Sequence, residues 1–219
     1  MPLRAVLLDF RGTLVTTIDD DAWVWEALLL LARPATPEHV SEVVRALRAP
    51  AARAGRLEAP GVDSHADLHR RTYLQVFADA GLDADLAHAL YDVESDLRHN
   101  PLAEDAAEAL QRLHAAGLRL AIVSDIHVDI RPAFAETGLL ELIHVFTLSF
   151  EQGAEKPDPR VFTRTLDALG VGAADALMVG DRSGPDGGAV EAGLTTLLLP
   201  PLRTVSDRRL HHVLTLCRT

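Results

Sequence analysis

The chain has 219 residues, 48 % hydrophobic and 24 % charged, the balance of an ordinary globular protein with one large domain or a core and a smaller insert. Its formal net charge of −11 argues against a nucleic-acid partner held through phosphate contacts, and its single cysteine, Cys217, excludes a disulfide framework and a cysteine-ligated metal site. The sequence contains neither an apolar run of about 18 residues nor a secretory leader pattern, so we expect a soluble, cytoplasmic protein without a membrane partner.

The first part of the chain combines one predicted strand with a helical segment. We predict a strand at residues 4–8, because the apolar run 5–8 ends at Asp9 and a glycine turn, which is typical of a buried strand. Residues 16–98 show helical periodicity and no strand pattern. Within them we predict helices at 20–32, 37–47, 65–80 and 83–98, and a loop rich in Ala, Gly and Pro at 49–60.

After residue 99, apolar strands alternate with helices. The predicted strands are 118–123, 145–149, 176–179 and 195–199, and the predicted helices are 103–116, 159–169 and 186–192. This alternation predicts an α/β protein whose parallel sheet is covered by helices on both faces. We therefore expect a core of residues 1–15 and 99–219, with a helical insert of residues 16–98 after the first strand.

Polar residues follow the predicted strands. Asp9 ends the first strand, Ser124 the second, and Asp181 follows Met178-Val179-Gly180. The carboxyl ends of parallel strands meet at one edge of the sheet, where α/β proteins place their sites. Phosphoryl transfer through an aspartate needs a carboxylate nucleophile, oxygen ligands for Mg²⁺, and cationic or hydroxyl groups around the phosphate.

The chain supplies a candidate for each of these parts. Asp9 would be the nucleophile, and Ser124 would donate its hydroxyl to a phosphate oxygen. Lys156, the only lysine beside 20 arginines, would balance charge between Asp9 and the phosphate. Asp181 would bind the metal ion, and Asp186 would either support the metal shell or hold Lys156.

Four segments, in order, resemble the four motifs of the haloacid dehalogenase (HAD) superfamily. They are Asp9-Phe10-Arg11-Gly12-Thr13, Ser124, Lys156-Pro157, and the stretch from Gly180-Asp181 to Asp186. The resemblance covers residues 1–14 and 100–200, and residues 16–98 stand where many members carry a helical cap. It implies a Rossmann-like core, Mg²⁺ as cofactor, an aspartyl-phosphate intermediate on Asp9, and Thr13 among the catalytic residues.

Arg11 departs from the pattern of the phosphatases in this family. At this position they carry a second aspartate, which protonates the leaving oxygen and then activates water. Arginine keeps its proton near neutral pH, so it cannot do this. In the family the same position binds Mg²⁺ through its backbone carbonyl, which Arg11 retains. The resemblance thus implies a metal site made of Asp9, Arg11, Asp181 and Asp186.

Two hypotheses keep the chain close to the phosphatases. In the first, it is a Mg²⁺-dependent phosphatase of a small phosphorylated metabolite. Its leaving group then needs no proton, as in an acyl phosphate, or the acid is one of three histidines, His65, His69 and His127. In the second, it is a non-catalytic phosphate-binding or regulatory protein. Arg11 would then pair with Asp9 or Asp181 in place of the metal charge.

The third hypothesis is a 2-haloacid dehalogenase-like hydrolase, because those enzymes also lack the second aspartate. Against it, Gly180-Asp181 resembles the metal-binding phosphatase version, and Asp125 stands where dehalogenases usually have asparagine. Phosphonate-cleaving relatives use a cap lysine, and residues 15–100 contain none. The apolar segment 23–32 offers a face for a homodimer, and we expect its tryptophans to pack rather than to bind substrate.

Overall fold

Five parallel strands form a single sheet in the computed structural model, which describes residues 3–49, 54–57 and 59–218. The strand order is β3-β2-β1-β4-β5, so β1, which leads to Asp9, lies at the centre. The strands are β1 (Ala5–Leu8), β2 (Arg119–Ser124), β3 (Val145–Leu148), β4 (Ala176–Gly180) and β5 (Thr195–Leu198). The α/β, Rossmann-like prediction with helices on both faces is confirmed.

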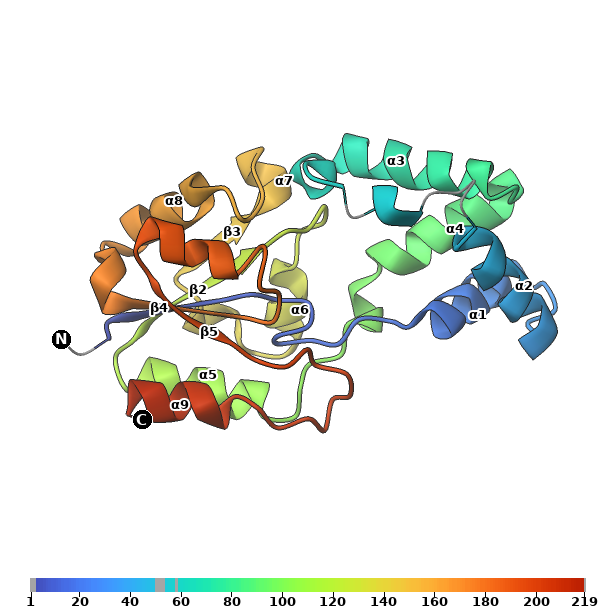
Figure 1. Ribbon diagram of the computed structural model, residues 1–219. Helices are drawn as coiled ribbons and strands as arrows, with labels where there is room; N and C mark the ends of the chain where they lie inside the picture. The colour runs from blue at the N-terminus through green and yellow to red at the C-terminus, as the bar shows by residue number, and fades with distance from the viewer. Residues whose placement is uncertain (1–2, 50–53, 58, 219) are drawn as a thin grey trace.

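Alternate residues of the central strands pack on opposite faces of the sheet. Val6 and Leu8 of β1 lie in one apolar cluster, whereas Ala5 and Leu7 lie in the other. The first face is covered by α5 (Ala106–Ala115), α6 (Arg131–Glu136) and α9 (His211–Cys217) (Figure 1). The second is covered by α8 (Pro159–Leu169) and the 3-10 helix η6 (Gly187–Ala192) (Figure 1). All four residues of β1 are buried, so packing on both faces of the sheet fixes the position of the carboxyl end of this strand.

The inserted segment forms a helical layer beyond the carboxyl end of β1 (Figure 1). It comprises α1 (Asp20–Leu30), α2 (Pro37–Leu47), α3 (Ala66–Asp79) and α4 (Ala84–Ser95), with short 3-10 helices η1 (Ala54–Arg56) and η2 (Val62–Ser64). The 3-10 helix η3 (Leu97–His99) leads back to the core. These helices bury an apolar cluster of their own, separate from the two clusters on the sheet. The division into two domains at residues 16 and 98 stays a prediction.

Helix α1 turns only one apolar face inward. Val24 and Leu28 are buried, and Trp23 packs against Phe77 and donates its indole N–H to the Leu90 carbonyl at 2.7 Å. The opposite face exposes Trp25, Leu29 and Leu30 to solvent. This is the face that the homodimer prediction requires, and the oligomeric state stays a prediction.

The structure corrects several predicted boundaries. Ser149 opens the short helix α7 (Ser149–Gln152) instead of ending β3, and residues 187–192 are a 3-10 helix. The helix predicted at 83–98 ends at Ser95, because Asp96 has an extended backbone. Part of the predicted loop 49–60, residues 50–53 and 58, lies outside the described residues. The sequence did not predict α6, α7, α9 or the 3-10 helices η1, η2, η4 (Leu140–Leu142) and η5 (Ala173–Asp175).

Across the part of the chain that the structure covers, no helix is long and apolar enough to cross a membrane. The cytoplasmic location stays a prediction.

The separate core of the helical layer is open to test with Leu90→Ala. Leu90 is fully buried on α4, and emptying its space should cost about 2–5 kcal/mol. Amide hydrogen exchange should show lost protection in α1 to α4, with β1 and β2 retained. The control is Leu30→Ala, a side chain 64 % exposed, which should change stability by less than about 0.5 kcal/mol. An equal loss of amide protection in β1 would contradict the view that the helical layer and the sheet have independent cores.

Candidate active site

A buried lysine holds two carboxylates together at the carboxyl edge of the sheet. The Lys156 ammonium donates to Asp9 Oδ1 and to Asp186 Oδ1, each at 2.6 Å. All three side chains are at most 2 % exposed. Thr13 donates its hydroxyl to the other oxygen, Asp9 Oδ2, at 3.2 Å. Four predicted site residues are thus brought into one hydrogen-bonded group.

Sheet pairing carries Asp9 to this position. Its backbone N–H donates to the Val179 carbonyl at 2.9 Å, which continues the pairing of β1 with β4 by one residue. Ser124, the last residue of β2, lies two residues past Ile122, which pairs with Leu8. Ser124 therefore ends its strand beside the Asp9 loop and is buried there.

Opposing effects act on the proton of Lys156. Burial works to lower its pKa, but the carboxylates of Asp9, Asp125 and Asp186 outweigh it and raise the pKa above the ordinary value. Asp125 also accepts from the Lys156 backbone N–H at 2.8 Å and lies 3.4 Å from the Arg182 guanidinium. Lys156 thus stays charged beside Asp9 throughout the neutral pH range.

Asp186 has both of its oxygens engaged. Oδ1 accepts from Lys156, and Oδ2 accepts from the backbone N–H groups of Asp181 and Arg182 at 3.0 and 2.9 Å. A side chain at Gly180 would collide with Asp186, so this close approach requires glycine there. Of the two roles predicted for Asp186, its contacts favour holding Lys156.

Asp181 has the free oxygen that a metal ligand needs. The carboxylates of Asp9, Asp181 and Asp186 offer oxygens that lie within 4.8 Å of one another. Asp181 Oδ1 is buried, and no donor among the described residues reaches it. Burial, and then Asp9 and Asp186, raise the pKa of Asp181 to about 6. Carboxylate oxygens are the ligands that Mg²⁺ prefers, so this set fits that ion.

Gly12 keeps the loop after Asp9 close to this set. It has a φ of +81°, and a Cβ on it would lie 2.6 Å from Asp181 Oδ2. Arg11 lies in the same loop, two residues after Asp9, and its carbonyl stays a predicted metal ligand. The catalytic and metal roles of all these residues remain predictions at this point.

The Arg11 side chain is directed toward the helical layer. Its guanidinium donates to Glu94 Oε1 at 2.6 Å, to the Glu94 carbonyl at 2.9 Å and to Asn100 Oδ1 at 3.3 Å. The pairing with Asp9 or Asp181, expected for a non-catalytic protein, is therefore wrong for this structure. Glu94 lies on α4, so this contact joins the Asp9 loop to the inserted helices.

The three candidate histidines are not placed as proton donors. His65 is exposed and pairs with the Ser64 hydroxyl at 2.9 Å. His69 and His127 are buried, and burial first of all lowers the pKa of His69 to about 2 and that of His127 to about 4. Both rings are therefore neutral near pH 7 and are poor proton donors there.

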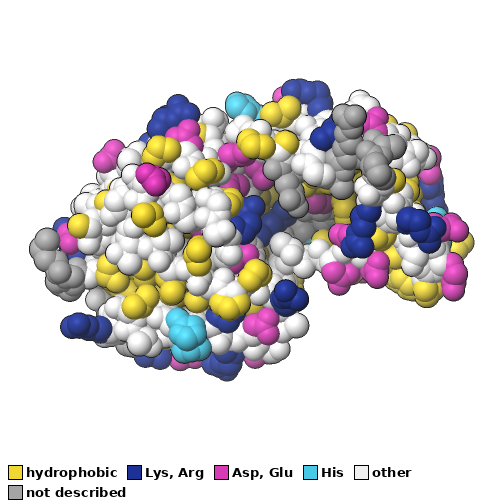
Figure 2. Space-filling view, in the orientation of Figure 1, with side chains coloured by type: hydrophobic (Ala, Val, Ile, Leu, Met, Phe, Trp, Pro, Cys, Tyr) yellow, Lys and Arg dark blue, Asp and Glu magenta, His cyan; other side chains and the backbone are white. Residues whose placement is uncertain are grey.

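A cleft of about 700 Å³ separates the sheet from the helical layer and opens onto the site. Figure 2 shows the surface hollowed between the two parts. Charged side chains of both signs line it, among them Arg11, Asp63, Glu94, Asp125, Lys156 and Arg182. The cleft is large enough for a small polar substrate.

Arg209 is a site residue that the sequence did not single out. It is buried near the C-terminus and donates to the carbonyls of Gly12, at 3.2 Å, and Thr13, at 2.7 Å, and to that of Pro200. The bonds to Gly12 and Thr13 hold the backbone of the loop after Asp9 in place. No motif surrounds Arg209, so only the fold reveals this contact.

A model of the haloacid dehalogenase-like hydrolase family matches residues 3–192. The chain is 36 % identical over 107 residues to the ribulose-1,5-bisphosphate 5-phosphatase of Halopiger xanaduensis, covering 48 % of the chain and 45 % of that protein. It is 31 % identical over 137 residues to the phosphoserine phosphatase of Thermus thermophilus, covering 60 % of the chain and 55 % of that protein. The chain thus spans about half the length of these curated relatives.

The fold is similar to that of a crystal structure of 2-haloacid dehalogenase from Pseudomonas syringae pv. Tomato DC3000. The TM-score is 0.64 with 22 % identity, covering 99 % of this chain and 98 % of that one. At this identity the likeness concerns the fold alone.

The buried ion cluster predicts a large cost for Lys156→Met. The variant leaves Asp9 and Asp186 without their cation, which should destabilise the fold by about 3–5 kcal/mol in chemical denaturation. Arg160→Met is the matched control, because it breaks an exposed pair with Asp158 and should destabilise the fold far less. Similar costs for both variants would show that the cluster does not stabilise the fold.

The acidic side of the cleft predicts a pH effect at Asp63. Burial, then Asp125, Glu94 and Glu155, raise the pKa of Asp63 to about 7. The native state then binds more protons than the unfolded one, so stability should fall as pH rises from about 4 to about 7. A third of the side chain is exposed, so we expect roughly 1–2 kcal/mol.

Denaturation across this pH range, with a chelator present, measures the effect. Asp63→Asn should remove this part of the slope and gain stability over the wild type as pH rises. A difference between the two proteins that does not change with pH would mean that Asp63 titrates normally.

Proposed function

The chain belongs to the haloacid dehalogenase-like hydrolase family, and we propose that it is a Mg²⁺-dependent phosphatase of a small phosphorylated metabolite, acting through an aspartyl-phosphate on Asp9. The observation that carries the proposal is the buried group of Asp9 and Lys156 beside the unpartnered oxygen of Asp181. It combines a nucleophile, a cation and an oxygen ligand in one group, of which Lys156 lines the cleft. The names of two relatives, both phosphatases, support the same reaction class.

Each residue of the site has its own role in the proposed reaction. Lys156 and Thr13 each hold one oxygen of Asp9 and so orient the carboxylate for attack on phosphorus. Lys156 then offsets charge on the phosphate, and the Ser124 hydroxyl donates to a phosphate oxygen. Asp186 and the Arg209 contacts keep Lys156 and the loop in place.

Asp9, Asp181 and the Arg11 carbonyl would hold Mg²⁺, with Asp186 behind them. When bound, the ion neutralises phosphate charge that would otherwise repel the Asp9 carboxylate. Asp181 must lose its proton for this, and with a pKa of about 6 it is ionised near neutral pH.

Arg11 limits the choice of substrate. Its guanidinium is occupied by Glu94 and keeps its proton, so this position supplies no acid for the leaving oxygen. The first step is therefore best suited to a leaving group that departs without a proton, as an acyl phosphate does, and the aspartyl-phosphate is then hydrolysed by water that this position does not activate. Alkyl phosphates, such as sugar phosphates, should react slowly.

A dehalogenase is the second candidate, favoured by one observation. The position of Arg11 lacks the carboxylate that phosphatases use, and dehalogenases lack it too. The buried oxygen of Asp181, which accepts no hydrogen bond from the described residues, argues against a dehalogenase. Attack on carbon with a halide leaving group does not require a metal ligand at the position of Asp181.

Assays with acetyl phosphate, an aryl phosphate and sugar phosphates test the proposal. We expect acetyl phosphate to be hydrolysed fastest, with Mg²⁺ required and a chelator abolishing turnover. Asp9→Asn should lose at least about 10³-fold in kcat, since the variant lacks the nucleophile. Turnover that survives in Asp9→Asn would exclude Asp9 from that role.

Arg11 variants test its role separately. Arg11→Asp should raise turnover of sugar phosphates by about 10²–10⁴-fold, because it restores an acid at this position. Arg11→Ala is the matched control, since it also loses the Glu94 contact but gains no acid. An inactive wild type with an active Arg11→Asp would favour the binding role. Chloride release from 2-chloropropionate without metal would favour the dehalogenase.

A further inference from the structure

A second cavity, of about 570 Å³, adjoins the cleft at the Arg11–Glu94 ion pair. It is lined by all four helices of the inserted layer and by the two segments that join this layer to the core. Ile18 belongs to the first of these segments and Asn100 to the second. Arg11, Tyr73 and Glu94 line both the cavity and the cleft, so the ion pair stands between the two spaces.

The wall of this cavity is largely apolar. The apolar side chains that line it belong to the apolar cluster of the helical layer or pack against it; they are Ile18, Trp23, Leu47, Leu57 and Val76. Two exposed charged residues of the lining pair with each other, because Arg48 Nε donates to Asp20 Oδ2 at 2.9 Å. Such a surface is suited to an apolar group of a small ligand.

Arg11 brings a positive charge to the junction of the two spaces. Its guanidinium carries five N–H donors, of which three bond to Glu94 and Asn100. The other two, one on each Nη atom, have no acceptor among the residues that the structure describes, and the side chain is 24 % exposed. These two N–H groups can donate to an anionic oxygen of a ligand in strong, charge-assisted bonds.

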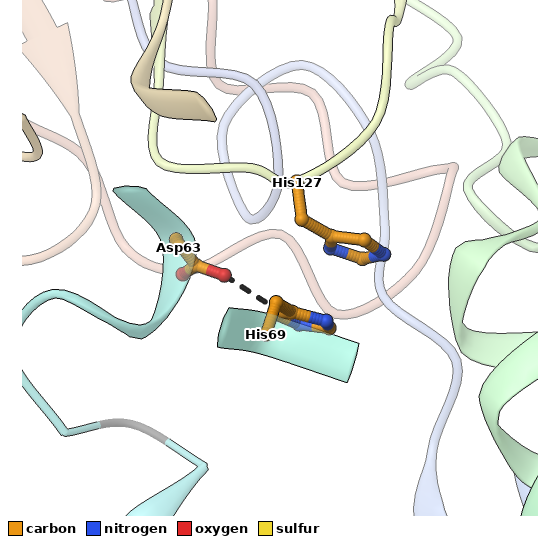
Figure 3. Close-up of side chains that lie close together, drawn as sticks. All are labelled: Asp63, His69 and His127. Carbon is orange, nitrogen blue, oxygen red and sulfur yellow. Dashed lines mark ion pairs between the residues drawn. The ribbon is translucent and has the colours of Figure 1, made fainter. Parts of the chain in front are cut away.

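Glu94 also lines the cavity, but its carboxylate is engaged elsewhere. Oε1 accepts from Arg11, whereas Oε2 is buried and lies 3.3 Å from His127 Nε2 and 4.0 Å from His69 Nε2. The two imidazole rings are stacked with their centroids 3.5 Å apart, and Asp63 lies to one side of them (Figure 3). Since Oε2 is buried beside these rings, little of the negative charge of Glu94 faces the cavity.

We propose that this cavity binds the acyl group of the substrate, and that the substrate is the mixed anhydride of phosphate with an apolar carboxylic acid larger than acetate. The inference rests on the proposed phosphatase function and names its substrate class. Asp9 attacks phosphorus, the bond from phosphorus to the acyl oxygen breaks, and the electron pair leaves on a carboxylate. Water then attacks the aspartyl-phosphate at phosphorus, which returns the Asp9 carboxylate and gives hydrogen phosphate and one proton to solvent.

The arginine and the apolar wall select the same class of substrate. An acyl phosphate releases a carboxylate, which needs a cation rather than a proton, and Arg11 offers its two remaining N–H groups to this product. An alkyl phosphate releases an alkoxide, which needs a proton that arginine does not give up. The apolar chain of the acid then occupies the wall beyond the guanidinium.

Binding of hexanoate, the product of such a substrate, tests the inference without turnover. Trp23 lines the cavity, whereas Trp25 is 38 % exposed on the opposite face of α1, so Trp25→Phe leaves Trp23 as the single tryptophan reporter. We expect a saturable change of its fluorescence with hexanoate, and roughly 10²-fold weaker binding of acetate, which lacks four methylenes. Calorimetry on the wild type measures the same binding without a substitution. Hexanoyl phosphate should likewise have a KM well below that of acetyl phosphate.

Two variants separate the apolar wall from the cation. Ile18→Glu places a negative charge in the wall and should weaken hexanoate binding by at least about 10-fold. Leu30→Glu, at a position 64 % exposed on the opposite face of α1, is the matched control and should bind like the wild type. Arg11→Met combined with Glu94→Gln removes the cation and its partner together. It should weaken hexanoate by about 10-fold or more, and uncharged hexanol by less than about two-fold. Circular dichroism checks that each variant is folded.

Two results would overturn the inference. One is a lack of hexanoate binding by the wild type in calorimetry. The other is hexanoate binding that both Ile18→Glu and the double variant leave unchanged. Neither result bears on Asp9, whose role is tested by turnover of acetyl phosphate. An Asp9→Asn protein without phosphatase activity should still bind hexanoate, so the two proposals can fail separately.

Discussion

The rest of the site depends on the buried contact of Lys156 with Asp9 and Asp186. Taking three charges out of water is costly, and only close contacts offset the cost. The three residues come from the ends of distant segments, so their meeting requires the parallel register of β1 with β4 and the loop before α8. The chemistry in turn needs the same arrangement, since it keeps a nucleophile oriented beside a fixed cation. Stability and proposed activity thus rest on one interaction.

Arg11 changes what this arrangement can do. A carboxylate at its position would face the substrate as an acid, whereas the guanidinium turns to Glu94 and Asn100 at the base of the helical layer. The residue that removes proton transfer from the loop therefore also ties that loop to the inserted helices. This contact is partly buried and charge-assisted, with a second hydrogen bond to the Glu94 carbonyl. The same arginine thus leaves the loop without an acid and links it to the inserted helices.

Much of the fold and of the proposed site could be predicted from the sequence. Buried parallel strands read as apolar runs, and the polar residue that ends such a run, as Asp9 and Ser124 do, has to lie at the sheet edge. Short elements such as α6 and α9 escaped prediction, because six or seven residues hold too little periodicity. Arg209 and Glu94 escaped for another reason. Their partners lie 9 to 197 positions away in the sequence, and only packing brings them together.

Glu94 connects the two sets of polar residues in this protein. One of its oxygens accepts from Arg11 in the loop of the proposed nucleophile, and the other faces His69 and His127. The guanidinium of Arg11 and the two buried imidazoles thus surround the Glu94 carboxylate, and through it the helical layer is joined to the loop after Asp9. This link uses contacts that lie outside the hydrogen-bonded group of Asp9, Lys156 and Thr13.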